Sequence, residues 1–173
     1  MDAASRAVGR RRIMTIKPTL IMMVGLPASG KSAFAKQFAK ENNFNIVSSD
    51  KIRGMLYGDE SIQGDSKEVF RIVHDMIFNN LYHGIDTIFD ACNIHKHYRI
   101  EFLSEVNEKV PECNKYCYHI SAPLSVCLER NKKRDRKVPV SVISQMAVDF
   151  DKPIPQEGFD SVYNICNWKG GEE

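Results

Sequence analysis

Short apolar runs alternate along the chain with longer segments in which apolar residues recur at helical spacing. Residues 20–24 (LIMMV) form an uninterrupted apolar run, which is typical of a central strand covered on both faces. Residues 69–81 carry Val, Ile, Met and Leu at helical spacing, which predicts a helix that packs one face against the core. This alternation predicts β-α units that build a parallel sheet.

The same patterns locate the remaining elements. Further strands are predicted over residues 45–48, 87–89 (followed by Asp90), 115–120 and 161–165. Further helices are predicted over residues 32–40, 51–57, 97–110 and 124–134, with Ser66 as the cap of the 69–81 helix and Pro139 in the first turn of another. Residues 58–64 are expected to form a loop, and residues 152–158, which contain prolines, an extended segment. We therefore expect an α/β architecture in three layers, with a five-stranded parallel sheet flanked by helices.

Length and charge add a domain boundary. The chain has 173 residues, of which 43% are hydrophobic, enough for one domain with a buried core. Residues 1–17 hold five Lys or Arg against Asp2, whereas the net charge of the whole chain is only +2. We therefore expect one domain over residues 18–173, preceded by a basic, disordered tail over residues 1–17. The alternatives for that tail are a remnant of an upstream start, with Met14 as initiator, and a targeting segment.

Composition argues against several classes of protein. No apolar run approaches the roughly 20 residues that cross a bilayer, so a membrane-spanning protein is not expected. The small net charge argues against a protein that coats nucleic acid by charge alone. The five cysteines are odd in number and no long apolar leader precedes them, which favours a reducing, cytoplasmic setting. Cys113 and Cys117 lack the second Cys or His pair of a zinc site.

Residues 25–32 match the pattern G-x-x-x-x-G-K-[ST] between a predicted strand and a predicted helix. In this motif glycines let backbone N–H groups point inward, and the helix N-terminus adds positive charge toward an anion. Lys31 is expected to neutralise the β- and γ-phosphate oxygens, and Ser32 to ligate Mg²⁺. The expected nucleotide-binding residues are Gly25, Leu26, Pro27, Ala28, Ser29, Gly30, Lys31 and Ser32.

The nucleotide is expected to be ATP. Residues 131–135 (NKKRD) resemble the N-K-x-D guanine reader, but their aspartate arrives one position late. The chain also lacks the length and the switch segments of motor and signalling NTPases. A small kinase with one acceptor pocket beside the phosphate loop is therefore the favoured interpretation.

Two aspartates follow predicted strands at the carboxyl edge of the sheet, where open α/β proteins bind ligands. Phosphorylation of an alcohol needs a carboxylate that takes the hydroxyl proton, and Asp50 suits this role. Arg53 lies on the same side of the predicted helix and suits an acceptor phosphate; the alternatives are a helix cap and an ordinary ion pair. Asp90 is expected to orient Mg²⁺ and, with Asn93, to face the acceptor. The alternative for Asp90 is again a cap.

A basic run occupies residues 130–137, which hold six Lys or Arg against one aspartate. Such a run is often a solvated face. The functional alternative is a lid whose arginines stabilise charge during phosphate transfer.

In their order and spacing these segments resemble the phage-type polynucleotide 5′-hydroxyl kinases, including the kinase half of animal polynucleotide kinase-phosphatases. The likeness covers residues 19–165 and rests on GLPASGKS, SSDKIR, IFDACN, CLERNKKR followed by VPVSVI, and FDKPIPQEGFD. The resemblance implies a P-loop kinase fold with a short basic lid, ATP and Mg²⁺, and transfer to the 5′-hydroxyl end of DNA or RNA. It also implies Asp50 as general base and Arg53 on the acceptor's neighbouring phosphate, with Arg134 and Arg130 on the donor phosphates.

Alternatives for the acceptor and the activity stay open at this point. Related P-loop kinases phosphorylate 5-hydroxymethyluracil in DNA, nucleosides or small metabolites. A nucleotide-dependent binding module, in which Asp50 is only a helix cap, is a further alternative. Such kinases are often fused to a 3′-phosphatase, for which this chain is expected to have no room, so end repair would need a separate phosphatase or ligase partner.

Overall fold

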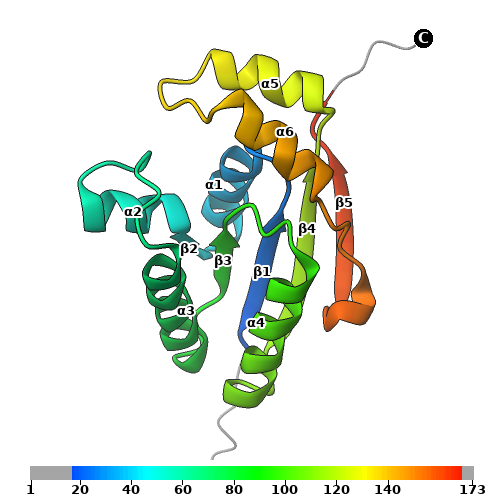
Figure 1. Cartoon of the computed structure of the whole chain (residues 1–173). Coiled ribbons are helices and arrows are strands. Elements are labelled where there is room, and N and C mark those ends of the chain that lie inside the picture. The colour runs from blue at the N-terminus through cyan, green and yellow to red at the C-terminus, as the bar shows by residue number, and fades with distance from the viewer. Residues whose placement is uncertain (1–16, 169–173) are drawn as a thin grey trace, which may run out of the picture.

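A five-stranded sheet in the order β2-β3-β1-β4-β5 forms the middle layer of the molecule (Figure 1). The computed structural model describes residues 17–168. All neighbouring strands are parallel, which confirms the predicted fold class. The strands are β1 (Thr19–Val24), β2 (Asn45–Ser48), β3 (Thr87–Asp90), β4 (Asn114–Ser121) and β5 (Ser161–Cys166).

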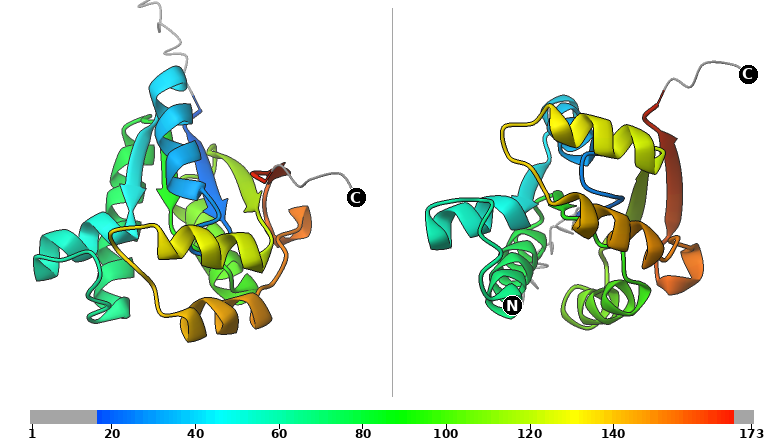
Figure 2. Two further views of the ribbon diagram at one scale, coloured as in Figure 1. Left: turned by 90° about the horizontal axis from the view of Figure 1, so that it is seen from above. Right: turned by 45° about the horizontal axis from the view of Figure 1, so that its top comes forward.

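Helices cover the sheet and its carboxyl edge. They are α1 (Lys31–Asn42), α2 (Ser49–Tyr57), α3 (Ser66–Tyr82), α4 (Lys96–Lys109), α5 (Leu124–Lys132) and α6 (Val140–Val148), with a 3₁₀ turn, η1 (Pro155–Glu157). Each predicted helix is present, with small shifts at its ends. Helices α5 and α6 pack against each other and lie across the carboxyl edge of the sheet (Figure 2).

Alternate residues of β1 point to opposite faces of the sheet and fill two cores. Leu20 and Met22 pack with buried residues of α3 and α4 on one face. Ile21 and Met23 pack with α1 on the other. Burial on both faces explains why β1 is a continuous apolar run and does not alternate with polar residues.

The second helix begins earlier than predicted, which changes the position of Asp50. Helix α2 starts at Ser49, and Ser48 is its N-cap with φ −115°. Asp50 therefore lies in the first turn of the helix, and the interpretation of Asp50 as the cap is wrong. The helix dipole favours a carboxylate in the first turn, so the helix extends upstream through this residue.

The starts of α3 and α6 also differ by one position from the prediction. Asp65 caps α3, because its carboxylate accepts hydrogen bonds from the backbone N–H groups of Lys67 and Glu68. Ser66 is therefore the first helical residue and not the cap. Pro139 is the N-cap residue of α6 and does not lie in the first turn.

The segment 152–158 is not extended throughout, contrary to the prediction, because it contains η1. This turn ends at Gly158 with φ +116°. Its carboxylate, Glu157, is buried in an ion pair with Arg99 of α4. A partner distant in the sequence thus bends a segment whose local composition predicts extension.

The structure describes enough of the chain to examine its helices for a membrane span, but not to examine the basic tail. In the part of the chain that the structure describes, no helix has both the length and the apolar character to span a bilayer. The basic tail falls outside the described residues except for Lys17, which pairs with Glu112 at 3.1 Å, so the disorder of that tail stays a prediction.

Candidate active site

The phosphate loop joins the end of β1 to the start of α1. The N–H of Gly25 donates to the carbonyl oxygen of Cys92 at 3.0 Å, which ties the loop to the segment after the neighbouring strand β3. Gly30 has φ +106°, and a Cβ at this position would collide with the side-chain amide of Asn167. The backbone conformation therefore requires glycine at position 30, and a Cβ would also displace the Asn167 side chain.

The phosphate loop contains two buried polar groups, the ammonium of Lys31 and the hydroxyl of Ser29. Lys31 is buried, and its Nζ donates to the carbonyl oxygen of Leu26 at 2.7 Å. The Oγ of Ser29 is buried and has no hydrogen-bond partner among the described residues. A buried ammonium and an unpartnered buried hydroxyl in one glycine-containing loop fit a bound phosphate, which would satisfy both.

The carbonyl of Ser29 is held from two other elements. Arg130 Nη1 of α5 and Asn167 Nδ2, which follows β5, both donate to this oxygen, at 3.2 and 3.0 Å. Arg130 Nη2 also donates to the carbonyl of Asn167 at 2.7 Å. The structure thus brings Arg130 to the phosphate loop, and its contact with a donor phosphate stays a prediction. Asn167 lies outside every motif, so sequence patterns do not indicate it.

Asp90, at the end of β3, lies beside the phosphate loop. Asp90 is 8% exposed, and the hydroxyl of Ser32 lies close enough to interact with its carboxyl. Burial raises the pKa of Asp90 above its ordinary value, opposed by the Ser32 hydrogen bond and by Lys31. Oxygen donors of this kind suit Mg²⁺, which keeps several waters and takes few protein ligands. Residues 17–168 contain no cluster of three or more His, Cys, Asp or Glu for a metal. Ser32 and Asp90 offer the few oxygen ligands that suit Mg²⁺ bound together with nucleotide phosphates.

Helix α2 carries the predicted acceptor residues. Arg53 Nη1 lies 3.3 Å from Asp50 Oδ1, so the two side chains meet on one side of the helix as predicted. Arg136, in the loop between α5 and α6, binds the same carboxylate, with Nη1 at 2.7 Å from Oδ2 and Nη2 at 3.0 Å from Oδ1. The hydrogen bond to Asp50 raises the pKa of Arg136. Arg136 belongs to the predicted basic run, but no sequence pattern distinguishes it from its neighbours.

Two other predicted site residues, Arg134 and Asn93, differ in the contacts that their side chains make. The basic loop between α5 and α6, residues 133–139, is called the lid below. Arg134 lines the cavity from this loop, and its side chain makes no hydrogen bond or ion pair with described residues. Asn93 has φ +47°, and its Nδ2 donates to the carbonyl of Met23 at 2.9 Å. Asn93 thus stabilises the loop that follows β3, and its contact with an acceptor stays a prediction.

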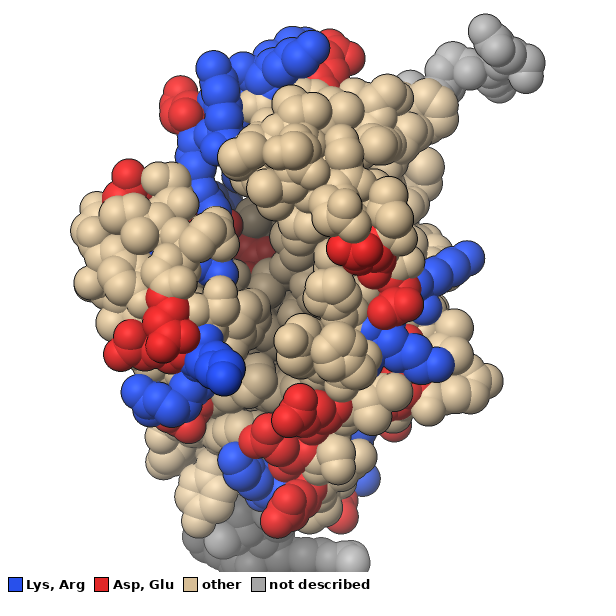
Figure 3. All heavy atoms as spheres, viewed as in Figure 1, with Lys and Arg blue, Asp and Glu red and all other residues tan. Residues whose placement is uncertain are grey.

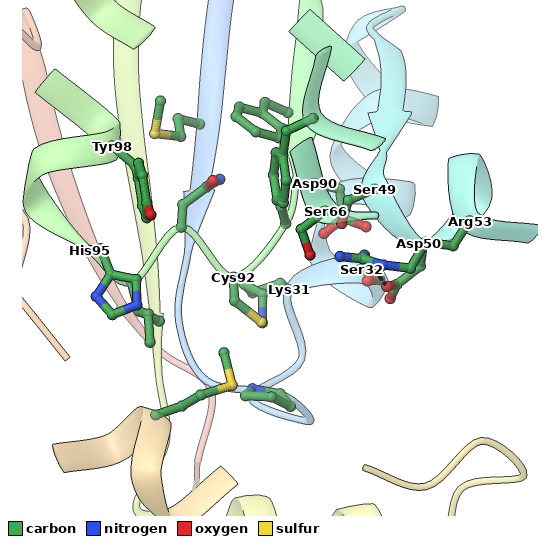
Figure 4. A pocket seen from close by; sticks show the side chains of 18 of the residues that line it. Lys31, Ser32, Ser49, Asp50, Arg53, Ser66, Asp90, Cys92, His95 and Tyr98 are labelled. Atoms are coloured by element: carbon green, nitrogen blue, oxygen red, sulfur yellow. Dashed lines mark hydrogen bonds and ion pairs between the residues drawn. The ribbon is translucent and has the colours of Figure 1, made fainter. Parts of the chain in front are cut away.

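These groups line one cavity of about 1450 Å³ at the carboxyl edge of the sheet. In the space-filling view it opens as a cleft, with Lys and Arg side chains gathered at its upper end, where the lid crosses (Figure 3). Figure 4 shows Lys31, Ser32, Asp50 and Asp90 toward one end of this pocket and Tyr98 toward the other. The phosphate loop and the candidate base therefore share one space.

Between α3 and α4 the cavity changes character. Its lining there includes the aromatic rings of Phe70, His74 and Phe78, together with the carboxylates of Glu101 and Glu105. Burial lowers the pKa of His74 below its ordinary value, so this ring is neutral near pH 7. Lys67, Arg71 and Lys109 also line the cavity from these helices, and Arg71 and Lys109 pair with Asp75 and Glu105. Charges of both signs thus surround the aromatic rings, which suit an uncharged part of a ligand.

A family model and a curated relative match most of the chain. The family model, described as an AAA domain, matches residues 20–153. The L-seryl-tRNA(Sec) kinase of Methanococcus maripaludis is 31% identical over 150 residues, which are 82% of this chain and 56% of that protein. The chain thus spans a little over half the length of this relative.

Solved structures with the same fold include two that differ in size. A chain in the structure of the Pnkp1/Rnl/Hen1 RNA repair complex matches with 23% identity and a TM-score of 0.64, over 76% of this chain and 43% of that one. A gluconokinase from Sinorhizobium meliloti 1021 matches with 18% identity and a TM-score of 0.58, over 89% of this chain and 85% of that one. At these identities the similarity establishes the fold.

Proposed function

The chain belongs to the AAA domain family of P-loop kinases, and from that premise we propose that it transfers the γ-phosphate of ATP to the 5′-hydroxyl end of a polynucleotide. The observation that carries this proposal is a shared cavity. Lys31 and Ser32 of the phosphate loop, Asp50 of α2 and Arg134 of the lid all line it. Phosphoryl transfer requires donor, acceptor and base in one such space, from which water is excluded.

The donor side is formed by the loop and by α1. Lys31 would neutralise the β- and γ-phosphate oxygens, and the buried hydroxyl of Ser29 would gain a partner. Ser32 and Asp90 would hold Mg²⁺, which would supply positive charge beside the phosphates. Arg134, unpaired with other described side chains, is placed to stabilise charge on the transferred group.

The acceptor side is formed by α2 and by the groove between α3 and α4. Asp50 would take the proton of the hydroxyl as its oxygen attacks the γ-phosphorus. Arg53 would bind the phosphate that follows the terminal sugar, since a guanidinium matches phosphate bidentately. The aromatic half of the cavity, with Phe70 and His74, would take the uncharged sugar and base. A terminal nucleoside with one adjacent phosphate fits this division of charge.

The test is a transfer assay with labelled ATP and a panel of acceptors: 5′-hydroxyl DNA and RNA oligonucleotides, duplex with hydroxymethylated bases, and free nucleosides. Label is expected on the 5′-hydroxyl oligonucleotides.

Asp50→Asn is expected to lower transfer by about 10²–10⁴-fold, the usual contribution of general-base catalysis, with ATP affinity nearly unchanged. Asp149→Asn, at the exposed C-terminal end of α6, is the matched control. Unchanged transfer by Asp50→Asn would exclude Asp50 as the base. Binding of ATP by the wild type without transfer to any acceptor of the panel would favour a binding module.

A second candidate is a kinase for an alcohol carried elsewhere on an RNA. It is favoured by the 31% identity to a protein named as an L-seryl-tRNA(Sec) kinase. Seryl-tRNA is therefore added to the acceptor panel, and label on the seryl group with none on 5′-hydroxyl ends would decide for this candidate. If 5′ ends are the acceptors, we propose that a separate phosphatase or ligase completes the repair of the broken strand.

A further inference from the structure

Both carboxylate oxygens of Asp50 are occupied by arginines. Arg136 binds Oδ2 through Nη1 at 2.7 Å and Oδ1 through Nη2 at 3.0 Å. Arg53 Nη1 also approaches Oδ1, at 3.3 Å. Arg136 comes from the lid, 86 residues further along the chain, and it is partly buried, with 22% of its side chain exposed. The lid is therefore attached to the candidate base itself.

This arrangement conflicts with the role of a general base. A carboxylate accepts a proton through a lone pair that faces the reacting hydroxyl, within about 2.6–3.2 Å. A bidentate guanidinium occupies the side of the carboxylate where both oxygens are most accessible. The side chain of Asp50 is 39% exposed, so lone pairs away from the arginines still face solvent. The lone pairs that face Arg136 can serve an incoming alcohol only after Arg136 has moved.

An anion next to the hydroxyl is the group that would move Arg136. Asp50, Arg53 and Arg136 together carry one excess positive charge, offset in part by Glu60, whose Oε2 lies 3.9 Å from Arg136 Nη1. A neutral alcohol offers Arg136 no replacement for its ion pair. A phosphate offers a second bidentate partner of greater charge, to which arginine is well matched.

We propose that Arg136 determines acceptor specificity by making transfer conditional on a phosphate beside the acceptor hydroxyl. This inference rests on the proposed function and extends it from the base to the lid. When the phosphate binds, Arg136 leaves Asp50 and joins Arg53 on the phosphate oxygens, while Arg53 stays in place on α2. Alcohols without such a group leave Asp50 paired, and so does water.

The transfer step then balances as follows. The acceptor oxygen forms a bond to the γ-phosphorus, and the bond from that phosphorus to the β–γ bridging oxygen of ATP breaks. The hydroxyl proton passes to Asp50, and ADP leaves with the electron pair of the broken bond. With water as the acceptor the same step releases inorganic phosphate, and Arg136 on Asp50 suppresses it.

The experiment compares two acceptors that differ only in the phosphate, thymidine 3′-monophosphate and thymidine. Wild-type protein is expected to favour the 3′-phosphate in kcat/KM by about tenfold or more, the effect of a charge-assisted hydrogen bond. In Arg136→Gln this preference is expected to fall by about tenfold, mainly through KM, while ATP hydrolysis without acceptor rises several-fold. Arg136→Lys keeps the charge without the planar fork and is expected to lie between the two.

Lys133→Gln is the matched control on the same lid, since Lys133 is exposed and pairs with Glu129 outside the cavity. It is expected to match wild type in both measurements. If Arg136→Gln also matches wild type in either the acceptor preference or the hydrolysis rate, the proposal is wrong. For each variant, a rise in Tm on addition of ATP verifies that the variant is folded and binds nucleotide.

A second measurement needs no substitution. 5′-Deoxythymidine 3′-monophosphate carries the phosphate but no reactive hydroxyl, so it is expected to stimulate ATP hydrolysis by wild type, whereas 5′-deoxythymidine is not. Equal rates with both compounds would overturn the proposal. Failure of the proposed function looks different: wild type would phosphorylate no 5′-hydroxyl acceptor in the panel, while the hydrolysis rate of Arg136→Gln would still test the pairing with Asp50.

Discussion

At the scale of single residues, Asp90 combines burial with a proposed role, Mg²⁺ binding, that requires its charge. Its pKa is raised by burial in the folded state. The folded protein therefore binds a proton here more readily than the unfolded chain does. The stability contributed by the protonated form is present at low pH and is lost as the pH rises through the raised pKa. The ionised carboxylate thus weakens the fold slightly, and a cation would offset this cost.

The acid side of the pH profile tests that role of Asp90. As the pH falls, kcat/KM for ATP is expected to decline. Because the pKa of Asp90 is raised above the ordinary 3.8, this decline is expected at a pH above that value. Raising the Mg²⁺ concentration is expected to move this decline to lower pH, since metal and proton compete for the same oxygens. The measurement is a set of pH profiles at two Mg²⁺ concentrations. If the pH of this decline is the same at both Mg²⁺ concentrations, the assignment of Asp90 to Mg²⁺ is wrong.

At the scale of elements, one buried ion pair attaches η1 to α4 and to the loop after β3. Arg99 Nε lies 2.6 Å from Glu157 Oε2, and Arg99 Nη2 lies 2.8 Å from Oε1. Arg99 Nη1 donates to the carbonyls of Asn93 and Ile94, at 2.8 and 3.0 Å. The pair therefore supports the segment that follows Asp90, and both of its side chains are nearly inaccessible to water.

Glu157→Ala is expected to lower the free energy of unfolding by about 3–5 kcal/mol, because it leaves the guanidinium of Arg99 buried without its counter-charge. The measurement is urea denaturation monitored by circular dichroism. Glu129→Ala breaks an exposed pair with Lys133 and is expected to cost less than about 1 kcal/mol. Equal losses in the two variants would show that the buried pair has no special role.

At the scale of the whole molecule, the cavity gathers residues from the phosphate loop, α2, β3 and the lid. A nucleotide that bridges these parts binds only the folded state, so it stabilises the whole domain by mass action. The contribution is about 2.7 kcal/mol at a concentration 100 times the Kd. For a domain of this length that corresponds to a rise of about 5–10 °C in Tm.

Lys31→Ala is expected to abolish most of this rise, because it removes the cation that faces the β- and γ-phosphates. The measurement is thermal unfolding with and without ATP and Mg²⁺. Lys40→Ala, in the exposed last turn of α1, is the control and should keep the full shift. A full shift in Lys31→Ala would exclude this lysine from the nucleotide site.

The place of the phosphate loop between β1 and α1 was predictable from the sequence because its parts are contiguous. An apolar run, a turn with glycines at 25 and 30, and a Lys-Ser pair at the start of a helix each act over a few residues. The β-α order was predictable because strands and helices have distinct hydrophobic periods. Even Asp50 and Arg53 follow this logic, since residues three apart meet on one helix face. Local rules failed at the helix caps, where Asp65 and Ser66 are both acceptable and backbone geometry selects one.

Only the tertiary structure decided which distant side chains meet. Arg136 on Asp50, Asn167 on the carbonyl of Ser29, and Glu157 on Arg99 join residues 86, 138 and 58 positions apart. No period or motif relates such pairs, because their contact depends on where the lid, the end of β5 and η1 come to lie against the sheet. For this chain the sequence thus determines a P-loop kinase fold and the position of the loop proposed to bind phosphate. Packing determines which lid arginine pairs with Asp50, the proposed base.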